Sequence, residues 1–417
     1  MSNNVSPYKA VRTMERLSEA WKQVYKNGIK STSIDTKNEI LEFKKNEIKN
    51  LRKIQRLLQQ NKFKFENSRG ILLKRKGKDP RPIVIASVQS RIVQRSILDV
   101  LQENSSIKKY YLSVPTSYGA IKGEDKGVRN AIIATIEAIK NGAEYFYKSD
   151  IASFFTKIAI PKVIEVISTF IPDKDFVELL RNATILEISN LNDLGDLKHY
   201  FIFDDIGTPQ GCCLSPLLGN IFLAEFDKEL NKNDIICLRY LDDFILLAPT
   251  EKAVRAAFRR ASKILAKLSL EAYTAVSDPK KAKVGYYKQG FEFLGVEILN
   301  KLIRPNKASC NKLLNEIKEI IKNSLEMNFS MTQSLYKEEY SVTKTLYHIH
   351  NKIKGWGNQY YFCNDRNIFI TLDEKISGEI DRYLNSFLLK REKLDAKQKR
   401  KQLGIHLLID SKNVPIT

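Results

Sequence analysis

Two adjacent carboxylates, Asp242 and Asp243, lie between two short apolar runs of the sequence. Residues 237–240 are predicted to form one β-strand and residues 244–248 a second, with the acidic pair at the tip of the hairpin. Two carboxylates at one turn repel each other unless a cation lies between them. Mg²⁺ suits this position, because one or two carboxylates bind it together with phosphate oxygens. A solvated acidic turn is the alternative, and this segment alone does not decide between the two.

Two further stretches carry groups that suit the same chemistry. Residues 147–155 are predicted to form a strand that delivers a third carboxylate, Asp150, at its end. Residues 207–220 read Gly-Thr-Pro-Gln-Gly-Cys-Cys-Leu-Ser-Pro-Leu-Leu-Gly-Asn, a loop that leads into a helix. A carboxylate strand, a Pro-Gln-Gly loop and a Tyr-Leu-Asp-Asp hairpin, in this order, resemble the palm motifs of reverse transcriptases. The residue sequence of the loop is most similar to that of the group II intron lineage of that family.

The resemblance implies an α+β fold of the right-hand polymerase type, with fingers, a palm of antiparallel sheet and helices, and a helical thumb. It implies an RNA-directed DNA polymerase with two Mg²⁺ ions held by Asp150, Asp242 and the carbonyl of Ile151. One ion lowers the pKa of the primer 3′-hydroxyl, and the other neutralises the triphosphate and the leaving pyrophosphate. Asp243 resembles the second aspartate of the hairpin, which supports the metal site rather than bridging the ions.

The resemblance also predicts contacts to the incoming nucleotide. Residues 71–83 read as strand, basic turn and strand, like the fingers hairpin of the family, in which Lys74 and Arg81 match residues that grip the triphosphate. A generic exposed basic hairpin is the alternative. Gln210 and Gly211 match residues that lie against the nucleotide and the template base, and glycine permits close backbone approach.

Phe155 is predicted to select the sugar. It is the fifth residue after Asp150 and matches the position that packs under the sugar of the incoming nucleotide. A large ring there clashes with a ribose 2′-hydroxyl and tolerates deoxyribose, which favours DNA as the product. The alternative is that Phe154 and Phe155 are both core residues, and this is the interpretation that we favour for Phe154.

Contacts to the leaving group and to nucleic acid are predicted elsewhere in the chain. Among the lysines of residues 280–283, we favour Lys281 as the group near the leaving pyrophosphate. Residues 87–102 are predicted to form a helix that directs Arg91 and Arg95 towards the template. The segment Phe293, Leu294 and Gly295 resembles the primer grip. Trp356 lies among basic and aromatic residues that suit nucleic-acid stacking, and a core anchor in a helical bundle is its alternative role.

The predicted helices and strands suggest six regions in the order of the polymerase hand. Helices are expected at 8–27, 36–60, 125–141, 215–230, 251–268, 307–326, 332–353 and 372–403, with two helices and an irregular or strand-like insert in 161–205. The regions are a helical N-terminal extension (1–65), fingers (66–130), the first part of the palm (131–160), a fingers/palm insert (161–205), the palm with its primer grip (206–302), and a helical thumb with a basic tail (303–417).

The charge of the chain indicates a polyanionic partner. The sequence has 417 residues, a formal net charge of +21 and a pI of about 9.5, which make nucleic acid the first candidate. No apolar run approaches the length of a membrane-spanning helix, and the N-terminus lacks a signal-peptide hydrophobic region. The five cysteines show no metal-type spacing, so we expect reduced packing residues in a cytoplasmic protein. Homo-oligomerisation is compatible with the basic helical surface, but the sequence shows no specific interface signal.

The resemblance predicts partners and a biological role. The expected partners are an RNA template, deoxynucleoside triphosphates and the DNA product. The compact pattern looks like that of bacterial reverse transcriptases linked to antiphage defence, which commonly use a dedicated structured noncoding RNA. The alternatives are a retron- or mobile-intron-type enzyme, a template-independent or protein-primed DNA polymerase, and a non-catalytic RNA-binding scaffold.

Overall fold

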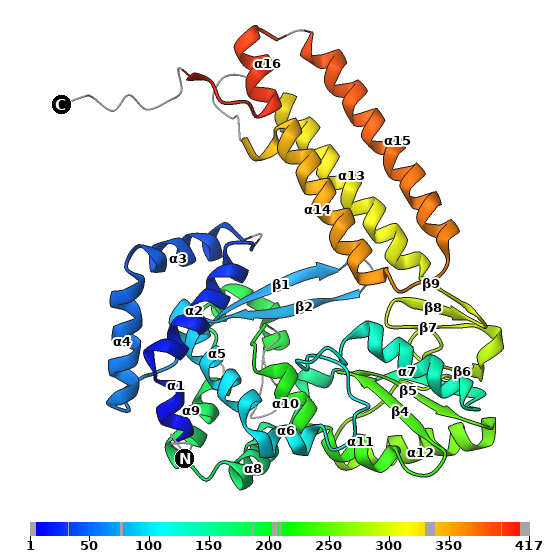
Figure 1. Cartoon of the computed structure of the whole chain (residues 1–417). Helices are drawn as coiled ribbons and strands as arrows, with labels where there is room; N and C mark the ends of the chain where they lie inside the picture. The colour runs from blue at the N-terminus through cyan, green and yellow to red at the C-terminus, as the bar shows by residue number, and fades with distance from the viewer. Residues whose placement is uncertain are drawn as a thin grey trace. The chain divides into compact units, whose positions relative to one another are not determined.

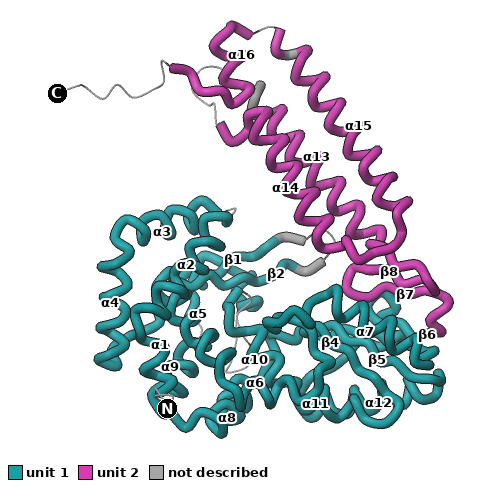
Figure 2. The backbone as a smooth tube through the Cα atoms, viewed as in Figure 1, with its two compact units in different colours: residues 1–285 teal, residues 286–417 magenta. Residues whose placement is uncertain are grey.

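A computed structural model describes residues 6–31, 33–75, 78–185, 187–201, 207, 211–329, 338–392 and 394–408. It combines helices with antiparallel sheets, so the predicted α+β fold class is confirmed (Figure 1). The chain divides into two compact units, residues 1–285 and residues 286–417 (Figure 2). The finer division into extension, fingers, palm and thumb stays a prediction. Among the described residues, no helix has the length and apolar character needed to cross a membrane.

The first unit begins with helices where the sequence predicts them, but two breaks divide them. They are Pro7–Val11 (α1), Met14–Gly28 (α2), Ile34–Lys45 (α3) and Glu47–Gln59 (α4). The predicted helix 8–27 is divided because the Thr13 side chain accepts a hydrogen bond from the backbone N–H of Arg16, which starts a new helix. The predicted helix 36–60 is interrupted at Asn46, whose φ of −127° and ψ of 37° are not helical.

A β-hairpin and two helices follow. Strands Arg69–Arg75 (β1) and Lys78–Ile85 (β2) pair antiparallel, so the two predicted strands are confirmed, whereas the predicted turn at residues 76 and 77 lies outside the described residues. The next helices are Val88–Glu103 (α5) and Ser105–Tyr111 (α6). The Ser87 side chain caps α5 by accepting a hydrogen bond from the backbone N–H of Ser90, close to the predicted start of this helix.

The central sheet has the strand order β4-β5-β3-β6. Its strands are Tyr145–Asp150 (β3), Ile236–Tyr240 (β4), Asp243–Ala248 (β5) and Lys283–Tyr286 (β6). Helices Val128–Lys140 (α7) and Glu251–Lys267 (α12) pack against it. Side chains 244–248 of β5 are all 0% exposed, which shows that both faces of the sheet are covered at this strand.

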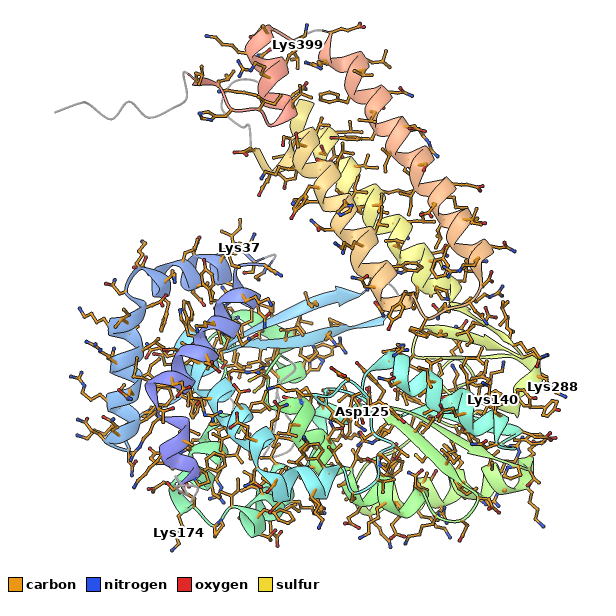
Figure 3. The ribbon with its side chains drawn as sticks, in the orientation of Figure 1. Lys37, Asp125, Lys140, Lys174, Lys288 and Lys399 are labelled. Atoms are coloured by element: carbon orange, nitrogen blue, oxygen red, sulfur yellow. The ribbon has the colours of Figure 1, made fainter. Side chains whose placement is uncertain are left out.

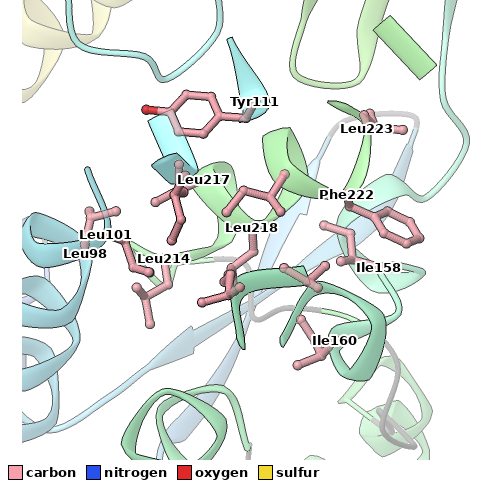
Figure 4. Close-up of a cluster of buried hydrophobic side chains, with 14 of the residues drawn as sticks. Leu98, Leu101, Tyr111, Ile158, Ile160, Leu214, Leu217, Leu218, Phe222 and Leu223 are labelled. Atoms are coloured by element: carbon pink, nitrogen blue, oxygen red, sulfur yellow. The ribbon is translucent and has the colours of Figure 1, made fainter. Parts of the chain in front are cut away.

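A second group of helices covers residues 160–184 and 215–230. They are Ile160–Phe170 (α8), Lys174–Thr184 (α9), Ser215–Phe222 (α10) and Ala224–Leu230 (α11). The predicted helix 215–230 is broken at Leu223, whose ψ of 6° is not helical. Residues 192–201 form 3₁₀ turns, in keeping with the irregular insert expected there. Figure 4 shows the apolar core around α10, in which Leu217, Leu218 and Phe222 meet side chains of α5, α6 and the start of α8.

The second unit contains a small sheet and long helices. Its strands are Phe291–Phe293 (β7), Val296–Leu299 (β8) and Leu302–Pro305 (β9), and its α-helices are Lys307–Phe329 (α13), Val342–Tyr360 (α14), Arg366–Arg391 (α15) and Ala396–Leu403 (α16). The predicted helix 372–403 is two helices, because a capping box at Asp395 starts α16. Ile317, Tyr383 and Phe387 belong to the core that joins these helices.

Candidate active site

The hairpin between β4 and β5 carries Asp242 in its turn. Tyr240 pairs with Asp243, so the turn consists of Leu241 and Asp242. Leu241 has a φ of +60°, a left-handed conformation that costs a non-glycine residue about 1 kcal/mol or more. Such a turn persists when surrounding groups hold it in place.

Hydrogen bonds hold the peptide groups on both sides of Asp242. The carbonyl of Leu241 accepts a hydrogen bond from Nη1 of Arg239 at 3.0 Å. The carbonyl of Asp242 accepts one from the backbone N–H of Ile151 at 3.0 Å. Because Ile151 directly follows Asp150, the second bond ties the acidic turn to the strand that carries the third carboxylate.

The structure brings the three predicted aspartates together at one edge of the central sheet. β3 ends at Asp150, which pairs directly with Asp243 at the start of β5. Residues opposite each other in an antiparallel pair have Cβ atoms roughly 4.5–5.5 Å apart. Asp242 precedes Asp243 in the turn, so all three carboxyl groups belong to one small region.

Burial and mutual repulsion raise the pKa values of Asp242 and Asp243. Burial, a hydrogen bond with Asp150 and the negative charges of Asp150 and Asp242 raise the pKa of Asp243 to about 8. Burial also raises the pKa of Asp242, and the positive charges of Lys281 and Arg81 oppose this rise. The Asp243 carboxyl therefore favours its protonated form at neutral pH, and carboxyl oxygens gathered at one sheet edge are donors of the kind that divalent cations prefer.

Lys281 is the cation that the structure places against these acids. Its Nζ lies 2.8 Å from Oδ2 of Asp150 and 5.0 Å from the ring centroid of Tyr273. The bond to Asp150 raises the pKa of Lys281. Within the described part of the chain, no group of three or more acidic, histidine or cysteine side chains is arranged to hold a metal ion. A divalent ion that binds Asp150 therefore competes with the Lys281 ammonium for this carboxylate.

We expect Mg²⁺ to stabilise the protein more strongly as the pH rises. The pKa of Asp243 is raised from 3.8 to about 8, so protonation favours the fold of the metal-free protein, and this contribution is lost as the pH rises through that range. Metal binding needs the ionised form. At saturating Mg²⁺ the melting temperature should rise by about 2 °C or more at pH 8, and by less at pH 6, as measured by differential scanning fluorimetry.

A matched variant tests the cause of this stabilisation. Asp243→Asn removes the group with the raised pKa, so it should stabilise the metal-free protein at pH 8 and flatten the pH dependence of the Mg²⁺ effect. Glu251→Gln changes an exposed acid of α12 and should leave both unchanged. An Mg²⁺ effect of equal size at both pH values in the wild type would contradict this account.

The β1–β2 hairpin carries Lys74 and Arg81, the two residues predicted to contact the triphosphate. The charge of Arg81 acts on Asp242, so its guanidinium lies within electrostatic range of the acidic residues. Lys74 lies on β1, and its side chain is outside the described residues. Arg81 pairs with Leu73 across the hairpin, immediately beside Lys74 in the sequence.

Gly211 shows why the Pro-Gln-Gly loop needs a glycine. Its φ is +117°, and a Cβ at this position would lie 2.8 Å from the carbonyl oxygen of Val84 on β2. Glycine thus permits a backbone approach that any other residue would obstruct. Gln210, the other predicted nucleotide contact in this loop, lies outside the described residues.

Phe154 and Phe155 differ in their surroundings. Phe154 is 2% exposed, and a Cβ on Gly219 would lie 2.8 Å from its ring, so it is the core residue that the sequence predicts. Phe155 is half-buried at the edge of the same core, with its ring centroid 5.1 Å from that of Phe154. A contact between Phe155 and a nucleotide sugar stays a prediction.

The two arginines predicted to face the template line a cavity of about 380 Å³. Its walls come from α2, α3, β2, α5 and the segment that starts at Gly211. Arg95 pairs with Asp99 at 2.9 Å. Nε and Nη2 of Arg91 have no hydrogen-bond partner within the described residues, and Glu39 is 3.6 Å away. Burial lowers the pKa of Arg91, so its charge lacks full compensation.

The predicted primer grip lies in the second unit. Phe293 pairs with Val296, and the turn between them contains Leu294 with a φ of +50° and Gly295 with a φ of +79°. Two positive φ values are typical of a type I′ hairpin turn. Phe293 is buried, whereas Leu294 and Gly295 are partly exposed.

Trp356 lies in the helical core of the second unit. It is half-buried on α14, and its ring centroid is 4.7 Å from that of Tyr360 and 6.1 Å from that of Phe369. This environment favours the core-anchor role over an open stacking surface, and its contact with nucleic acid stays a prediction.

Sequence reasoning missed two features of this region. Arg239 is fully buried behind the acidic turn, and the signal for it was a single arginine inside an otherwise apolar strand. All five cysteines are free thiols. The S–H of Cys213 and nearby backbone N–H groups lower the pKa of Cys212, which lines the same cavity as Arg91. This lowered pKa distinguishes Cys212 from the other four cysteines, whose pKa values are raised, and the sequence did not indicate the difference.

Comparison with known proteins agrees with the motifs. The family model described as reverse transcriptase (RNA-dependent DNA polymerase) matches residues 73–298, more than half of the chain. An uncharacterized 91 kDa protein in the cob intron of Schizosaccharomyces pombe is 29% identical over 179 residues, which cover 42% of this chain and 20% of that protein. The putative COX1/OXI3 intron 2 protein of Saccharomyces cerevisiae is 23% identical over 363 residues, 82% of this chain and 39% of that protein.

A bacterial protein is also similar to part of the chain. The group II intron-encoded protein LtrA of Lactococcus lactis subsp. cremoris is 27% identical over 157 residues, which cover 38% of this chain and 24% of that protein. The chain thus spans between 20% and 39% of the length of these three relatives. The predicted similarity to the group II intron lineage is confirmed.

Proposed function

Because the chain belongs to the reverse transcriptase (RNA-dependent DNA polymerase) family, we propose that it is an RNA-directed DNA polymerase. The observation that carries this proposal is the meeting of Asp150, Asp242 and Asp243 at one edge of the central sheet, with Lys281 and Arg81 in electrostatic range. Acidic groups for metal ions, together with basic groups for a triphosphate, are the parts that phosphoryl transfer requires.

The proposed cofactor is a pair of Mg²⁺ ions held by Asp150, Asp242 and the carbonyl oxygen of Ile151, with Asp243 as a supporting ligand. When bound, the ions lower the pKa of the primer 3′-hydroxyl and neutralise charge on the triphosphate. The chain itself fixes the acids: strand pairing holds Asp150 opposite Asp243, and hydrogen bonds from the Arg239 guanidinium and the Ile151 N–H hold the turn around Asp242.

Basic residues complete the proposed reaction. Lys281 carries a protonated ammonium at neutral pH, as its raised pKa requires, and it is proposed to donate a proton to the leaving pyrophosphate. Lys74 and Arg81 are the proposed cations for the triphosphate, the arginine as a fork and the lysine as a point charge. Gln210 and Gly211 are proposed to lie against the nucleotide and template base.

The proposed RNA–DNA hybrid is held by shape and backbone contacts. Arg91 lines a cavity and has guanidinium nitrogens without hydrogen-bond partners among the described residues, and with Arg95 it is proposed to contact the template. The hairpin of Phe293, Leu294 and Gly295 is proposed to steady the primer, with Trp356 supporting nucleic-acid binding.

Positively charged side chains occur in both units, which supports an interface with nucleic-acid phosphates. Figure 3 labels lysines of α3, α7, α9, α16 and the 3₁₀ turn Tyr287–Gln289, elements drawn from both units. With a net charge of +21, each unit can contribute to phosphate contacts.

Primer extension tests the proposed activity. The purified protein is given a defined RNA template, an annealed DNA primer, deoxynucleoside triphosphates and Mg²⁺, and the products are sequenced. We expect DNA complementary to the template, and removal of Mg²⁺ with EDTA should stop synthesis. DNA unrelated to the template would instead indicate untemplated synthesis, and no product on any template would overturn the proposal.

We further propose that the enzyme acts in the cytoplasm of a bacterium, in antiphage defence with a dedicated structured noncoding RNA. Its support is the likeness of the motifs to compact defence-linked enzymes and the lack of the retron wording Ala-Pro-x-Ser-Pro after the Pro-Gln-Gly loop. A phage challenge of cells that carry the native locus tests this role. Protection should require intact Asp242 and Asp243, and protection by the double alanine variant would favour a non-catalytic scaffold.

A further inference from the structure

A buried ion pair lies directly behind the acidic turn. Arg239 precedes Tyr240 on β4, and its side chain is 0% exposed. Its Nε donates to Oδ1 of Asp227 at 2.7 Å, and its Nη2 donates to Oδ2 at 2.5 Å. Buried ion pairs are costly to desolvate, and apolar residues of similar volume often stabilise a fold equally well. Packing alone therefore does not explain why these two charged residues lie here.

The remaining guanidinium nitrogen reaches the turn itself. Nη1 of Arg239 donates to the carbonyl of Leu241 at 3.0 Å and to Oδ1 of Asn220 at 3.0 Å. Asn220 is fully buried on α10 and donates from Nδ2 to the carbonyl of Gly119 at 2.9 Å. The guanidinium is thus fixed by Asp227 on α11 and Asn220 on α10. Its hydrogen bond to the Leu241 carbonyl restrains the backbone directly before Asp242.

A short segment closes the other side of this assembly. The backbone N–H of Arg239 donates to the carbonyl of Thr116 at 2.9 Å, and the N–H of Tyr118 donates to the carbonyl of Arg239 at 2.8 Å. A Cβ on Gly119 would lie 2.7 Å from the backbone nitrogen of Leu241. Glycine at this position lets the segment press against the acidic turn.

We propose that Arg239 is a positioning residue for the polymerase reaction: anchored by Asp227 and Asn220, it holds the left-handed Leu241 and so sets where the Asp242 carboxylate meets the metal ions. The inference rests on the proposed function and extends it to a residue that acts through the backbone. Its counterpart on the other side of Asp242 is the hydrogen bond from Ile151. Misplacement of a reacting group by about 1 Å can reduce a rate by about 100-fold.

Two variants separate positioning from stability. The double variant Arg239→Met/Asp227→Leu removes both buried charges, a change that folds often tolerate. Arg239→Lys keeps a cation opposite Asp227 but loses the planar fork that also reaches the Leu241 carbonyl. For the double variant we expect a kcat about 100-fold lower with a KM for nucleotide within about 3-fold of wild type, because the loss concerns geometry in the transition state. Both variants should need more Mg²⁺ for half-maximal rate and, without any substrate, more Mg²⁺ for half of the rise in melting temperature that the ion causes.

Ser96→Ala is the matched control. It removes a different buried hydrogen bond, 2.6 Å long, between α5 and the Val11 carbonyl, so it should lower the melting temperature without changing the Mg²⁺ requirement. A folded double variant that polymerises within about 3-fold of wild type would overturn the positioning role. If the double variant does not fold, Arg239→Lys decides, and an unchanged Mg²⁺ requirement overturns the inference. A wild-type protein that makes no DNA overturns the proposed function together with this inference.

Discussion

Replacement of Asp242 by asparagine should reduce RNA-templated DNA synthesis by about 1,000-fold or more, because a bound metal ion contributes several kcal/mol of transition-state stabilisation. Asparagine preserves the size of the side chain, and the hydrogen bonds from the Arg239 guanidinium and the Ile151 N–H end on backbone carbonyls and do not involve the carboxylate. The fold should therefore survive, and its melting temperature serves as the check. The rate is measured by addition of a single nucleotide to a primer.

The other two acids provide a graded comparison. Asp150→Asn should be as severe as Asp242→Asn, because Asp150 is the second proposed ligand of both ions. Asp243→Asn should be milder, since its proposed role is supporting. Glu251→Gln, an exposed acid on α12, should leave the rate unchanged. Losses below about 10-fold for both Asp150 and Asp242 would exclude them as ligands of the catalytic metals.

Replacement of Phe155 by valine should admit ribonucleotides. If its ring lies under the nucleotide sugar, the smaller side chain opens space for a 2′-hydroxyl, and the preference for deoxynucleotides should fall by about 100-fold. The ratio of kcat/KM for a deoxynucleotide and the matching ribonucleotide measures this preference. The rate with the deoxynucleotide should change little, because the change leaves the acids and basic residues in place.

Phe154, the neighbouring phenylalanine in the chain, provides the control for the Phe155 variant. It is 2% exposed beneath Gly219, so Phe154→Ala should destabilise the fold by about 3–5 kcal/mol through a cavity. Sugar preference should not change in this variant. If Phe155→Val destabilises the protein without altering sugar preference, Phe155 is a core residue and the sugar contact is wrong.

The sequence was most informative where local chemistry and chain order coincide. The hairpin at 237–248 could be predicted because strands with a period of two and a tight acidic turn leave few arrangements. The β1–β2 hairpin was predictable from two strand-like runs that are neighbours in the sequence. Asp150 was assigned to the same site by the order of the family motifs, and the structure adds the strand register that places Asp150 opposite Asp243.

Contacts between distant parts of the chain were not predictable. Arg239 is separated by 12 residues from Asp227 and by 19 from Asn220, and nothing in a single sequence pairs them. Helix breaks at Thr13 and Asn46 were also missed, because the apolar periodicity continues across them while side-chain capping or backbone geometry ends the helix. Long-range hydrogen bonds and local capping thus account for the main differences.

Sequencing of the nucleic acids that co-purify with the protein tests the central claim most directly. Wild type and the Asp242→Ala/Asp243→Ala variant are purified from cells that carry the native locus, and every bound RNA and DNA is sequenced. The account predicts one abundant structured RNA in both samples and complementary DNA in the wild type alone. Equal amounts of complementary DNA in both samples, or no enrichment of nucleic acid in either, would contradict RNA-templated DNA synthesis at these aspartates.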